Sequence, residues 1–325
     1  MDFNTSLGRS SNAVVARVAA LDWPLLQRFT DRLVPVGFAL MTAAVVWKFV
    51  VTPEWIGIDA SLYTAASAAW LNGFDPWAVT LVGVYYAAPP PTLLAFVLFV
   101  WMPPLAVSLL WVIGSFILAI LAIRALKLPL WWVAFPPIVD GALTGNPDVA
   151  VLALLVVAGG RLGALAPFLK IYALVPMFGE RRWRQIGLAA ALLFATALFL
   201  PWAAWFAELP EITKHLADTS RTTSVYGRPV LMVIAVVALL SLGIRRAGWL
   251  SVPLLWPSTQ LHYAAIAIPG LTPYLALLWC IPVPEVWLAS TVAFAFYECT
   301  IARRRPSIGS LDTASVSPPQ GSVGR

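Results

Sequence analysis

Asp59 is the residue of this chain best placed to do chemistry. It follows the first long apolar run, and Tyr63 comes four positions later, so the two side chains share one face if this stretch is helical. A carboxylate where a membrane segment meets water is costly to place and is a functional candidate by default. Asp59 could act as a general base that takes a proton from an acceptor hydroxyl. The alternative is a helix cap or a solvated interfacial acid.

Two further candidates lie inside apolar runs. Lys170 lies within residues 162–178, and a buried ammonium group needs an anionic partner. Its role is either to contact a lipid phosphate or to extend toward the cytoplasmic surface. His262 has Ser258, Thr259 and Gln260 as polar neighbours, which favours a polar site there, although a lone histidine is more often a hydrogen-bonded structural residue.

The longest polar loop, residues 208–228, carries a third group of candidates. Arg221 and Arg228 can bind a phosphate through two parallel hydrogen bonds each, and Tyr226 lies beside them. A solvated loop explains the same residues equally well.

The remaining polar interruptions have simpler explanations. Asp75 precedes Pro76, as expected of a helix cap. Asp140 and the segment Gly145-Asn146-Pro147-Asp148 separate two apolar runs and are explained by a turn. The sequence has no phosphate-binding glycine loop, no His/Cys metal spacing and no Asp-x-Asp pair, so we predict neither a metal site nor a cofactor.

Composition indicates the environment in which these residues work. Hydrophobic residues make up 60% of the 325 residues and charged residues 11%, and the mean hydropathy is +0.83. A soluble domain carries about 25% charged residues. The 16 Trp and 27 Pro residues also suit membrane helices and their interfaces. The sequence therefore predicts an all-α polytopic integral membrane protein.

The net charge of +6 does not indicate nucleic-acid binding. The basic residues form short clusters beside apolar runs, which is typical of cytoplasmic loops under the positive-inside rule. These clusters are Arg28 with Arg32, residues 181–184, residues 245–246 and residues 303–305. Only two cysteines occur, both in apolar runs, so no disulfide framework is expected.

Apolar segments divide the chain into a cytoplasmic segment over residues 1–33 without a cleavable signal, a membrane domain over 34–302 and a disordered cytoplasmic tail over 303–325. Length arithmetic gives about 9–11 spans. Residues 53–88 are expected to form an extracytoplasmic loop with short interfacial helices. Residues 271–302 are too long for one straight span and suggest a short re-entrant piece plus one helix.

The predicted spans leave one conflict. They are 34–51, one opening at Pro91, one ending near Arg124, and then 130–144, 147–160, 162–179, 185–206, 228–243 and 248–268. Six spans before Arg181 would place Arg124 and Lys127 outside, against the charge rule. Either one segment in that part is re-entrant or the two charges are tolerated.

Several motifs together resemble glycosyltransferase family 87, polyprenyl-phosphate-sugar-dependent enzymes of the GT-C superfamily that are well represented in actinobacteria. The pattern Asp59-x-x-x-Tyr63-x-x-Ala66, followed by Leu71-x-Gly73-x-Asp75-Pro76, is similar to the family's first extracytoplasmic loop. The run from Tyr86 to Pro91 is similar to its aromatic-x-Pro-Pro element. The resemblance covers about residues 40–270.

Three later motifs match less closely. Residues 145–148 resemble a Gly-Gln-x-Asn element, with Asn146 in place of Gln. Lys170-Ile171 resembles a Lys-Pro element without the proline. The segment Trp256-Pro257-Ser258-Thr259-Gln260-Leu261-His262 resembles a Ser-Pro…Trp-x-His motif, with Gln260 where tryptophan is usual.

The resemblance implies a GT-C-like bundle in a bacterial plasma membrane and an inverting sugar transfer on the extracytoplasmic side. The donor would be a polyprenyl-phosphate sugar, with mannose expected, and the acceptor a glycolipid or cell-envelope glycan such as a phosphatidylinositol mannoside. Asp59 would be the general base and His262 would position acceptor or phosphate. The expected substrate-binding residues are Tyr63, Lys170, Arg221, Tyr226 and Arg228.

Two other functions remain open. A transporter or lipid flippase could use the same buried lysine and outer carboxylate, although no internal repeat is evident. An inactive GT-C-like partner subunit would also account for a short chain with altered motifs.

Overall fold

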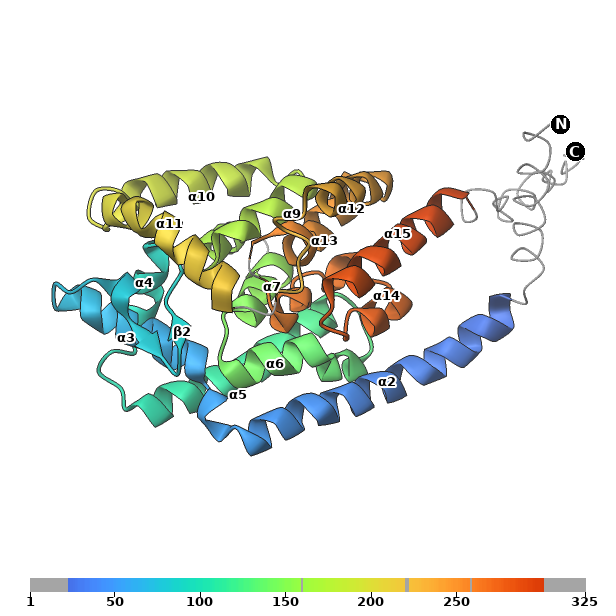
Figure 1. Cartoon of the computed structure of the whole chain (residues 1–325), viewed down its shortest axis with the longest axis horizontal. Coiled ribbons are helices and arrows are strands. Elements are labelled where there is room, and N and C mark those ends of the chain that lie inside the picture. Colours follow the sequence, from blue (N-terminus) through green and yellow to red (C-terminus); the bar gives the residue numbers. More distant parts are fainter. Residues whose placement is uncertain (1–22, 159, 220–221, 258, 301–325) are drawn as a thin grey trace, which may run out of the picture.

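The computed structural model describes residues 23–158, 160–219, 222–257 and 259–300, and Figure 1 shows its architecture. The described part is 74% helical with 14 α-helices and one small β-hairpin, so the predicted all-α class is confirmed. The predicted tail over 303–325 and most of the predicted N-terminal segment lie outside the described residues.

The α-helices follow one another with short connections, many of them 3₁₀ turns. In chain order the α-helices are α2 (Trp23–Val51), α3 (Ile58–Leu71), α4 (Pro91–Val97), α5 (Pro104–Ala125), α6 (Pro136–Thr144), α7 (Asp148–Val156), α8 (Ala166–Leu169), α9 (Leu174–Gly179), α10 (Trp183–Thr196), α11 (Trp202–Thr219), α12 (Pro229–Ser241), α13 (Ile244–Leu255), α14 (Pro273–Leu278) and α15 (Pro284–Thr300). The 3₁₀ turns cover Pro53–Trp55, Pro76–Ala78, Leu130–Ala134, Leu162–Leu165, Ile171–Ala173, Leu261–Ala265 and Ile268–Gly270.

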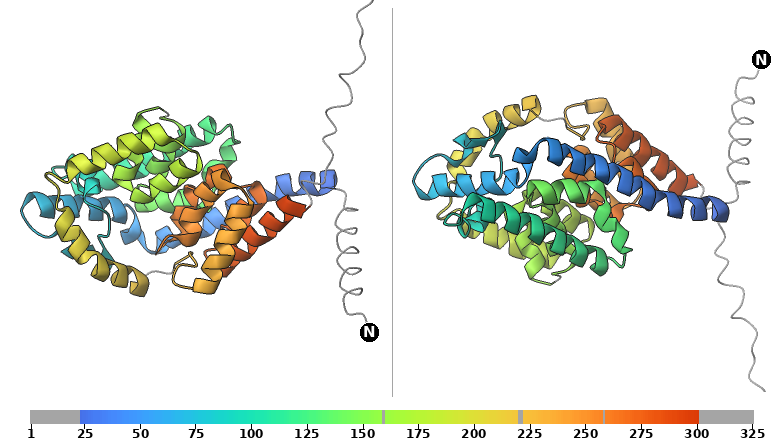
Figure 2. Two further views of the ribbon diagram at one scale, coloured as in Figure 1. Left: turned by 90° about the horizontal axis from the view of Figure 1, so that it is seen from above. Right: turned by 90° about the horizontal axis from the view of Figure 1, so that it is seen from below.

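In the part of the chain that the structure describes, two helices are long and apolar enough to cross a membrane, namely Arg32–Val51 within α2, and α5. Helix α2 runs along one side of the molecule in both Figures 1 and 2. Its exposed side chains include Val36, Leu40 and Trp47, a surface that fits lipid better than water. These features support a membrane protein, whereas the count of 9–11 spans stays a prediction.

Helices α6 and α7 meet at 117°, and together they pass the same test as a broken span or re-entrant loop. The bend follows from Gly145, which ends α6 in the left-handed conformation at φ +71°, and from Pro147, which directly precedes α7. The turn predicted over residues 145–148 is therefore confirmed. A re-entrant pair here is one of the two ways to remove the charge conflict at Arg124 and Lys127.

Other predicted spans are shorter or interrupted. The span expected from Pro91 is only the short helix α4, and residues 162–179 form α8, α9 and two 3₁₀ turns. Pro167 and Pro176 lie in this second stretch. A proline has no backbone N–H, so it cannot donate the hydrogen bond that would continue a preceding helix. At the C-terminal end, α14 and α15 form the short piece plus one helix expected over 271–302.

The predicted first loop is mostly ordered structure. It contains α3 and the hairpin of β1 (Thr80–Leu81) and β2 (Val84–Tyr85), in which Thr80 pairs with Tyr85. Stacked rings join α3 to α4 and α5, because Phe96 lies 4.9 Å from Tyr63 and 4.7 Å from Trp111 between ring centroids. This aromatic packing fixes α3 against the bundle.

A polar cluster, called here the Glu180 cluster, joins α9 to α13. One oxygen of Glu180 accepts hydrogen bonds from Arg245 at 3.1 Å and from Trp249 at 2.9 Å, and the other accepts two from Arg182 at 2.8 and 3.2 Å. Partial burial alone raises the pKa of Glu180, but these donors outweigh it and hold the pKa below its usual value. Two predicted cytoplasmic basic clusters thus converge on one carboxylate.

The helices can approach closely at this cluster because both lack a side chain there. A Cβ atom on Gly179 would lie 2.8 Å from the Cα atom of Gly248. Conversely, a Cβ atom on Gly248 would lie 2.9 Å from the Cα atom of Gly179. Small residues at a crossing allow such backbone contact between apolar helices.

Candidate active site

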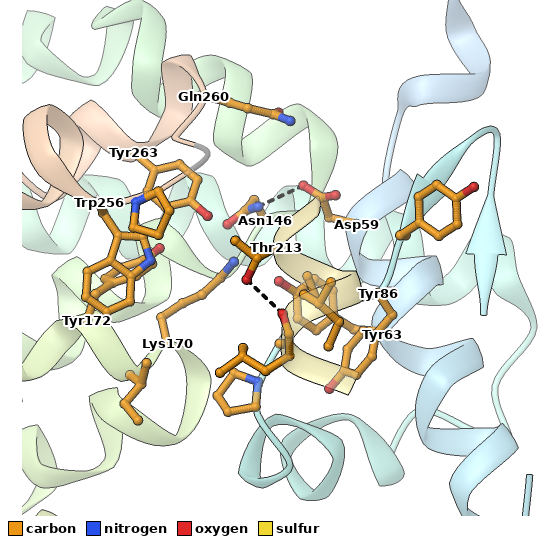
Figure 3. A pocket seen from close by; sticks show the side chains of 18 of the residues that line it. Asp59, Tyr63, Tyr86, Asn146, Lys170, Tyr172, Thr213, Trp256, Gln260 and Tyr263 are labelled. Atoms are coloured by element: carbon orange, nitrogen blue, oxygen red, sulfur yellow. Dashed lines mark hydrogen bonds between the residues drawn. The ribbon is translucent and has the colours of Figure 1, made fainter. Parts of the chain in front are cut away.

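A cavity of about 540 Å³ opens beside α3 and brings together residues from six parts of the chain. Figure 3 shows its polar side chains, including Asp59, Asn146 and Lys170. Its lining residues come from α3, the segment from β2 to Pro89, the bend between α6 and α7, the stretch 170–178, α11, and residues 256–263. Of the residues predicted to form the site, Asp59, Tyr63, Lys170 and His262 line this cavity.

Asp59 is held at the start of α3. Gly57 precedes this helix in the left-handed conformation at φ +69°, and its backbone N–H donates to the carbonyl oxygen of Leu143 at 2.8 Å. A side chain at this glycine would collide with Ser108, since its Cβ would lie 2.3 Å from the serine Cβ. The half-buried Asp59 side chain accepts a hydrogen bond on Oδ2 from the Asn146 amide at 2.8 Å.

Asn146 is oriented by its own turn. Its Oδ1 accepts a hydrogen bond from the backbone N–H of Asp148 at 3.1 Å, which leaves the amide NH₂ to face Asp59. The close approach also needs Gly145, whose Cβ, if present, would lie 2.9 Å from that of Ala60. The sequence indicated only a turn here, and the polar residues of that turn were the available signal for a functional contact.

Lys170 is buried, with 8% of its surface exposed, where α8 ends in extended backbone. Its ammonium nitrogen lies 5.4, 5.6 and 6.0 Å from the ring centroids of Tyr63, Tyr263 and Tyr172. Such distances give cation–π contacts. Among the residues that the structure describes, no carboxylate forms an ion pair with this ammonium and no group accepts a hydrogen bond from it. An anion that enters the cavity can therefore form an ion pair with Lys170 and accept its hydrogen bonds.

His262 lies between two buried carboxylates. Its Nδ1 is 3.3 Å from Oδ2 of Asp140, and its Nε2 is 3.8 Å from Oδ2 of Asp148. The other oxygen of Asp140 accepts a hydrogen bond from Lys48 at 3.1 Å, and the other oxygen of Asp148 accepts one from the Tyr172 hydroxyl. Sequence reasoning had assigned both aspartates to a turn and thus missed these contacts.

The predicted arginine site is not brought to the cavity. Arg228 precedes α12 and forms an exposed ion pair with Glu285, and Tyr226 is exposed nearby; neither residue lines the cavity. Arg221 lies outside the described residues. Among the described residues, Lys170 is thus the predicted phosphate-binding cation that lines the cavity.

Helix α11 supplies a wall that the sequence did not indicate. The first part of the predicted polar loop, up to Thr219, is helical. Leu209 and Ile212 line the cavity from this helix, together with Trp205 one turn earlier. The aromatic residues Tyr172, Trp256 and Tyr263 line the cavity across from Tyr63 and Tyr86 (Figure 3).

Comparison with protein-family models, with curated proteins and with solved structures finds no match for this chain. The resemblance to glycosyltransferase family 87 thus rests on the sequence motifs, and the function rests on those motifs together with the geometry of the cavity.

Proposed function

We propose that this chain is an integral membrane glycosyltransferase that moves a sugar, mannose in the first instance, from a polyprenyl-phosphate donor to a glycolipid or cell-envelope glycan. One observation carries the proposal. An anchored carboxylate, Asp59, and a buried ammonium that forms no ion pair with any described residue, Lys170, line the same cavity. A base for a hydroxyl and a cation for a phosphate are the two groups that this reaction requires.

Asp59 acts as the general base. It takes the proton of an acceptor hydroxyl as the hydroxyl oxygen attacks the anomeric carbon of the donor sugar. Asn146 donates to Oδ2, so it stabilises the ionised carboxylate and holds its orientation. A general base of this kind contributes roughly 10²–10⁴-fold to the rate.

Lys170 binds the donor phosphate. As the new carbon–oxygen bond forms, the bond from the anomeric carbon to the phosphate oxygen breaks, and polyprenyl phosphate leaves with the electron pair. A buried cation stabilises this charge more strongly than an exposed one, because the surrounding dielectric is lower. Attack opposite the phosphate inverts the anomeric configuration.

The cavity also contains surface suited to a lipid-linked substrate. Aliphatic and aromatic side chains from the stretch 170–178 and from α11 line it beside the polar groups, including Ile171, Leu174, Val175, Phe178, Trp205 and Leu209. A polyprenyl chain can leave such a lining into the bilayer without exposure to water. The 9–11 spans and the extracytoplasmic position of Asp59 are part of the same proposal.

The test is sugar transfer by the full-length protein in membranes supplied with radiolabelled polyprenyl-phosphate-mannose and a lipid extract as acceptor. Labelled glycolipid is expected with the wild type and is expected to fall about 10²–10⁴-fold with Asp59→Asn. Asp75→Asn is the matched control, because Asp75 is an exposed cap that only accepts from the backbone of Trp77.

Equal labelling by wild type and Asp59→Asn would exclude Asp59 as the base. Movement of labelled donor across sealed vesicles without any acceptor would favour the transporter alternative. Absence of transfer by wild type, combined with retained donor binding, would favour an inactive partner subunit.

A further inference from the structure

Four charged or ionisable side chains form a line from the surface to the cavity wall. Lys48, near the end of α2, contacts Asp140 of α6, which contacts His262, which faces Asp148 of α7. The exposed fractions of the side chains fall along this line, from 52% at Lys48 to 7%, 3% and 0%. The line ends at the Tyr172 hydroxyl, which donates to Asp148.

Hydrogen-bonding capacity limits the protonation state of this line. An ionised carboxylate only accepts hydrogen bonds, and a neutral imidazole has one donor nitrogen and one acceptor nitrogen. Both ring nitrogens of His262 face carboxylate oxygens, at 3.3 and 3.8 Å. A neutral ring between two ionised carboxylates would direct a lone pair at a buried negative charge. The three side chains Asp140, His262 and Asp148 therefore carry one proton more than a neutral imidazole and two ionised carboxylates would.

The neighbouring donors indicate where this proton lies. Lys48 donates to the second oxygen of Asp140, and the Tyr172 hydroxyl donates to the second oxygen of Asp148. Both contacts favour the ionised form of the aspartate concerned. Among the described residues, no other side chain is hydrogen-bonded to the imidazole, whose ring stacks on that of Tyr263.

We infer that Asp140 is a positioning residue that holds His262 as an imidazolium ion between Asp140 and Asp148, and that Lys48 compensates the second oxygen of Asp140. Charges then alternate from Lys48 to Asp148, so no uncompensated charge is buried along the line. Both ring nitrogens are donors in this state, so His262 is a fixed cation in the cavity wall and is not free to accept a proton from a substrate.

This inference concerns the resting protein and does not depend on the proposed transfer reaction. It does distinguish Asp59 from His262, the two residues expected to act on the substrate, because of these two only Asp59 keeps the capacity to act as a base. Asp59 and Lys170 line the same cavity as His262, and neither is paired with the ring among the described residues.

The experiment is nitrogen NMR of the full-length protein, labelled with ¹⁵N-histidine and reconstituted in lipid bilayers. The chain has two histidines, so His215→Gln leaves His262 as the one ring observed. At pH 8 an exposed histidine, with a usual pKa of about 6.5, is neutral. We expect both His262 nitrogens to resonate as an imidazolium at this pH. A neutral ring would overturn the inference.

Asp140→Asn keeps the shape of the side chain and removes its charge, so we expect a neutral ring at pH 8. An unchanged imidazolium would exclude Asp140 as a positioning residue. Lys48 is half-exposed, which makes its replacement safe for folding. As a like charge, Lys48 does not itself favour the imidazolium, so we expect the ring to stay protonated at pH 8 with Lys48→Met. A neutral ring in this variant would overturn the assignment of the imidazolium to its contacts with the two aspartates.

Discussion

The Glu180 cluster and the cavity cluster, composed of Asp59, Asn146, Lys170 and His262, place charges within the same apolar protein in different ways. Each oxygen of Glu180 accepts two hydrogen bonds, and two arginines neutralise its charge. In the cavity cluster, no carboxylate of the described residues forms an ion pair with the buried Lys170, and no described group accepts a hydrogen bond from its ammonium.

This difference separates structural charges from functional ones. Burying a charge costs free energy that its partners must offset. The Glu180 cluster supplies those partners internally, so it stabilises the crossing of α9 and α13. The cavity cluster leaves part of that compensation to a ligand, which is the arrangement expected of a binding site.

Lys170→Met is the variant with the largest expected effect. Loss of the cation is expected to reduce sugar transfer about 10²-fold or more, because the leaving phosphate loses its charge partner. Stability is expected to stay the same or rise, since a buried ammonium without a counterion is replaced by an apolar side chain. Transfer assays and thermal unfolding in lipid nanodiscs measure the two effects.

Lys214→Met is the matched control for this variant, because Lys214 lies on the exposed face of α11 in an ion pair with Glu211. Its transfer activity is expected to match that of the wild type. A clear loss of stability with Lys170→Met would show that this lysine has a structural role, and would erase the contrast with Glu180.

Glu180→Gln is expected to show the reverse pattern. Removal of the charge leaves Arg182 and Arg245 without their carboxylate, and the free energy of unfolding is expected to fall by about 1–3 kcal/mol. Transfer activity is expected to persist, since Glu180 does not line the cavity. Denaturation midpoints in detergent test this. Glu298→Gln is the control, because it breaks one partly exposed ion pair with Arg246. The free energy of unfolding of this variant should fall by less than about 1 kcal/mol.

Acid pH should remove the stability that the Glu180 charge contributes, with a smaller effect than the substitutions above. The pKa of Glu180 in the folded protein lies below its ordinary value of 4.5. Its contribution to stability is therefore fully present above pH 4.5 and is lost as the pH falls through the lower, folded-state pKa. Unfolding scans of wild type and Glu180→Gln should converge below pH 4.5. A constant difference between the two at all acid pH values would contradict this assignment.

The sequence predicted the features that depend on neighbouring residues. Composition indicated an all-α protein, and α3 does place Asp59 and Tyr63 four positions apart on one helix whose residues line the cavity. The length of residues 271–302 also predicted a short piece and a helix, and in the structure Pro273 and Pro284 begin α14 and α15.

Contacts between distant residues could not be predicted in this way. Asp59 is 87 positions from Asn146, Lys48 is 92 from Asp140, and Asp140 is 122 from His262. Periodicity records which face of an element is apolar, but not which polar residue of another element it meets. For the same reason Arg228 was a reasonable phosphate-binding candidate, although in the structure its charge is paired with Glu285.

The hydrogen bond from Asn146 occupies one oxygen of Asp59 and has a stereochemical consequence for the proposed reaction. Oδ2 is engaged, and Oδ1 accepts no hydrogen bond from the described residues. Asn146 cannot reverse its amide without losing the bond from the Asp148 N–H. In the proposed reaction, Oδ1 is therefore the oxygen with both lone pairs open to the reacting hydroxyl of an acceptor sugar, so the direction in which Oδ1 points biases the regiochemistry of the new glycosidic linkage.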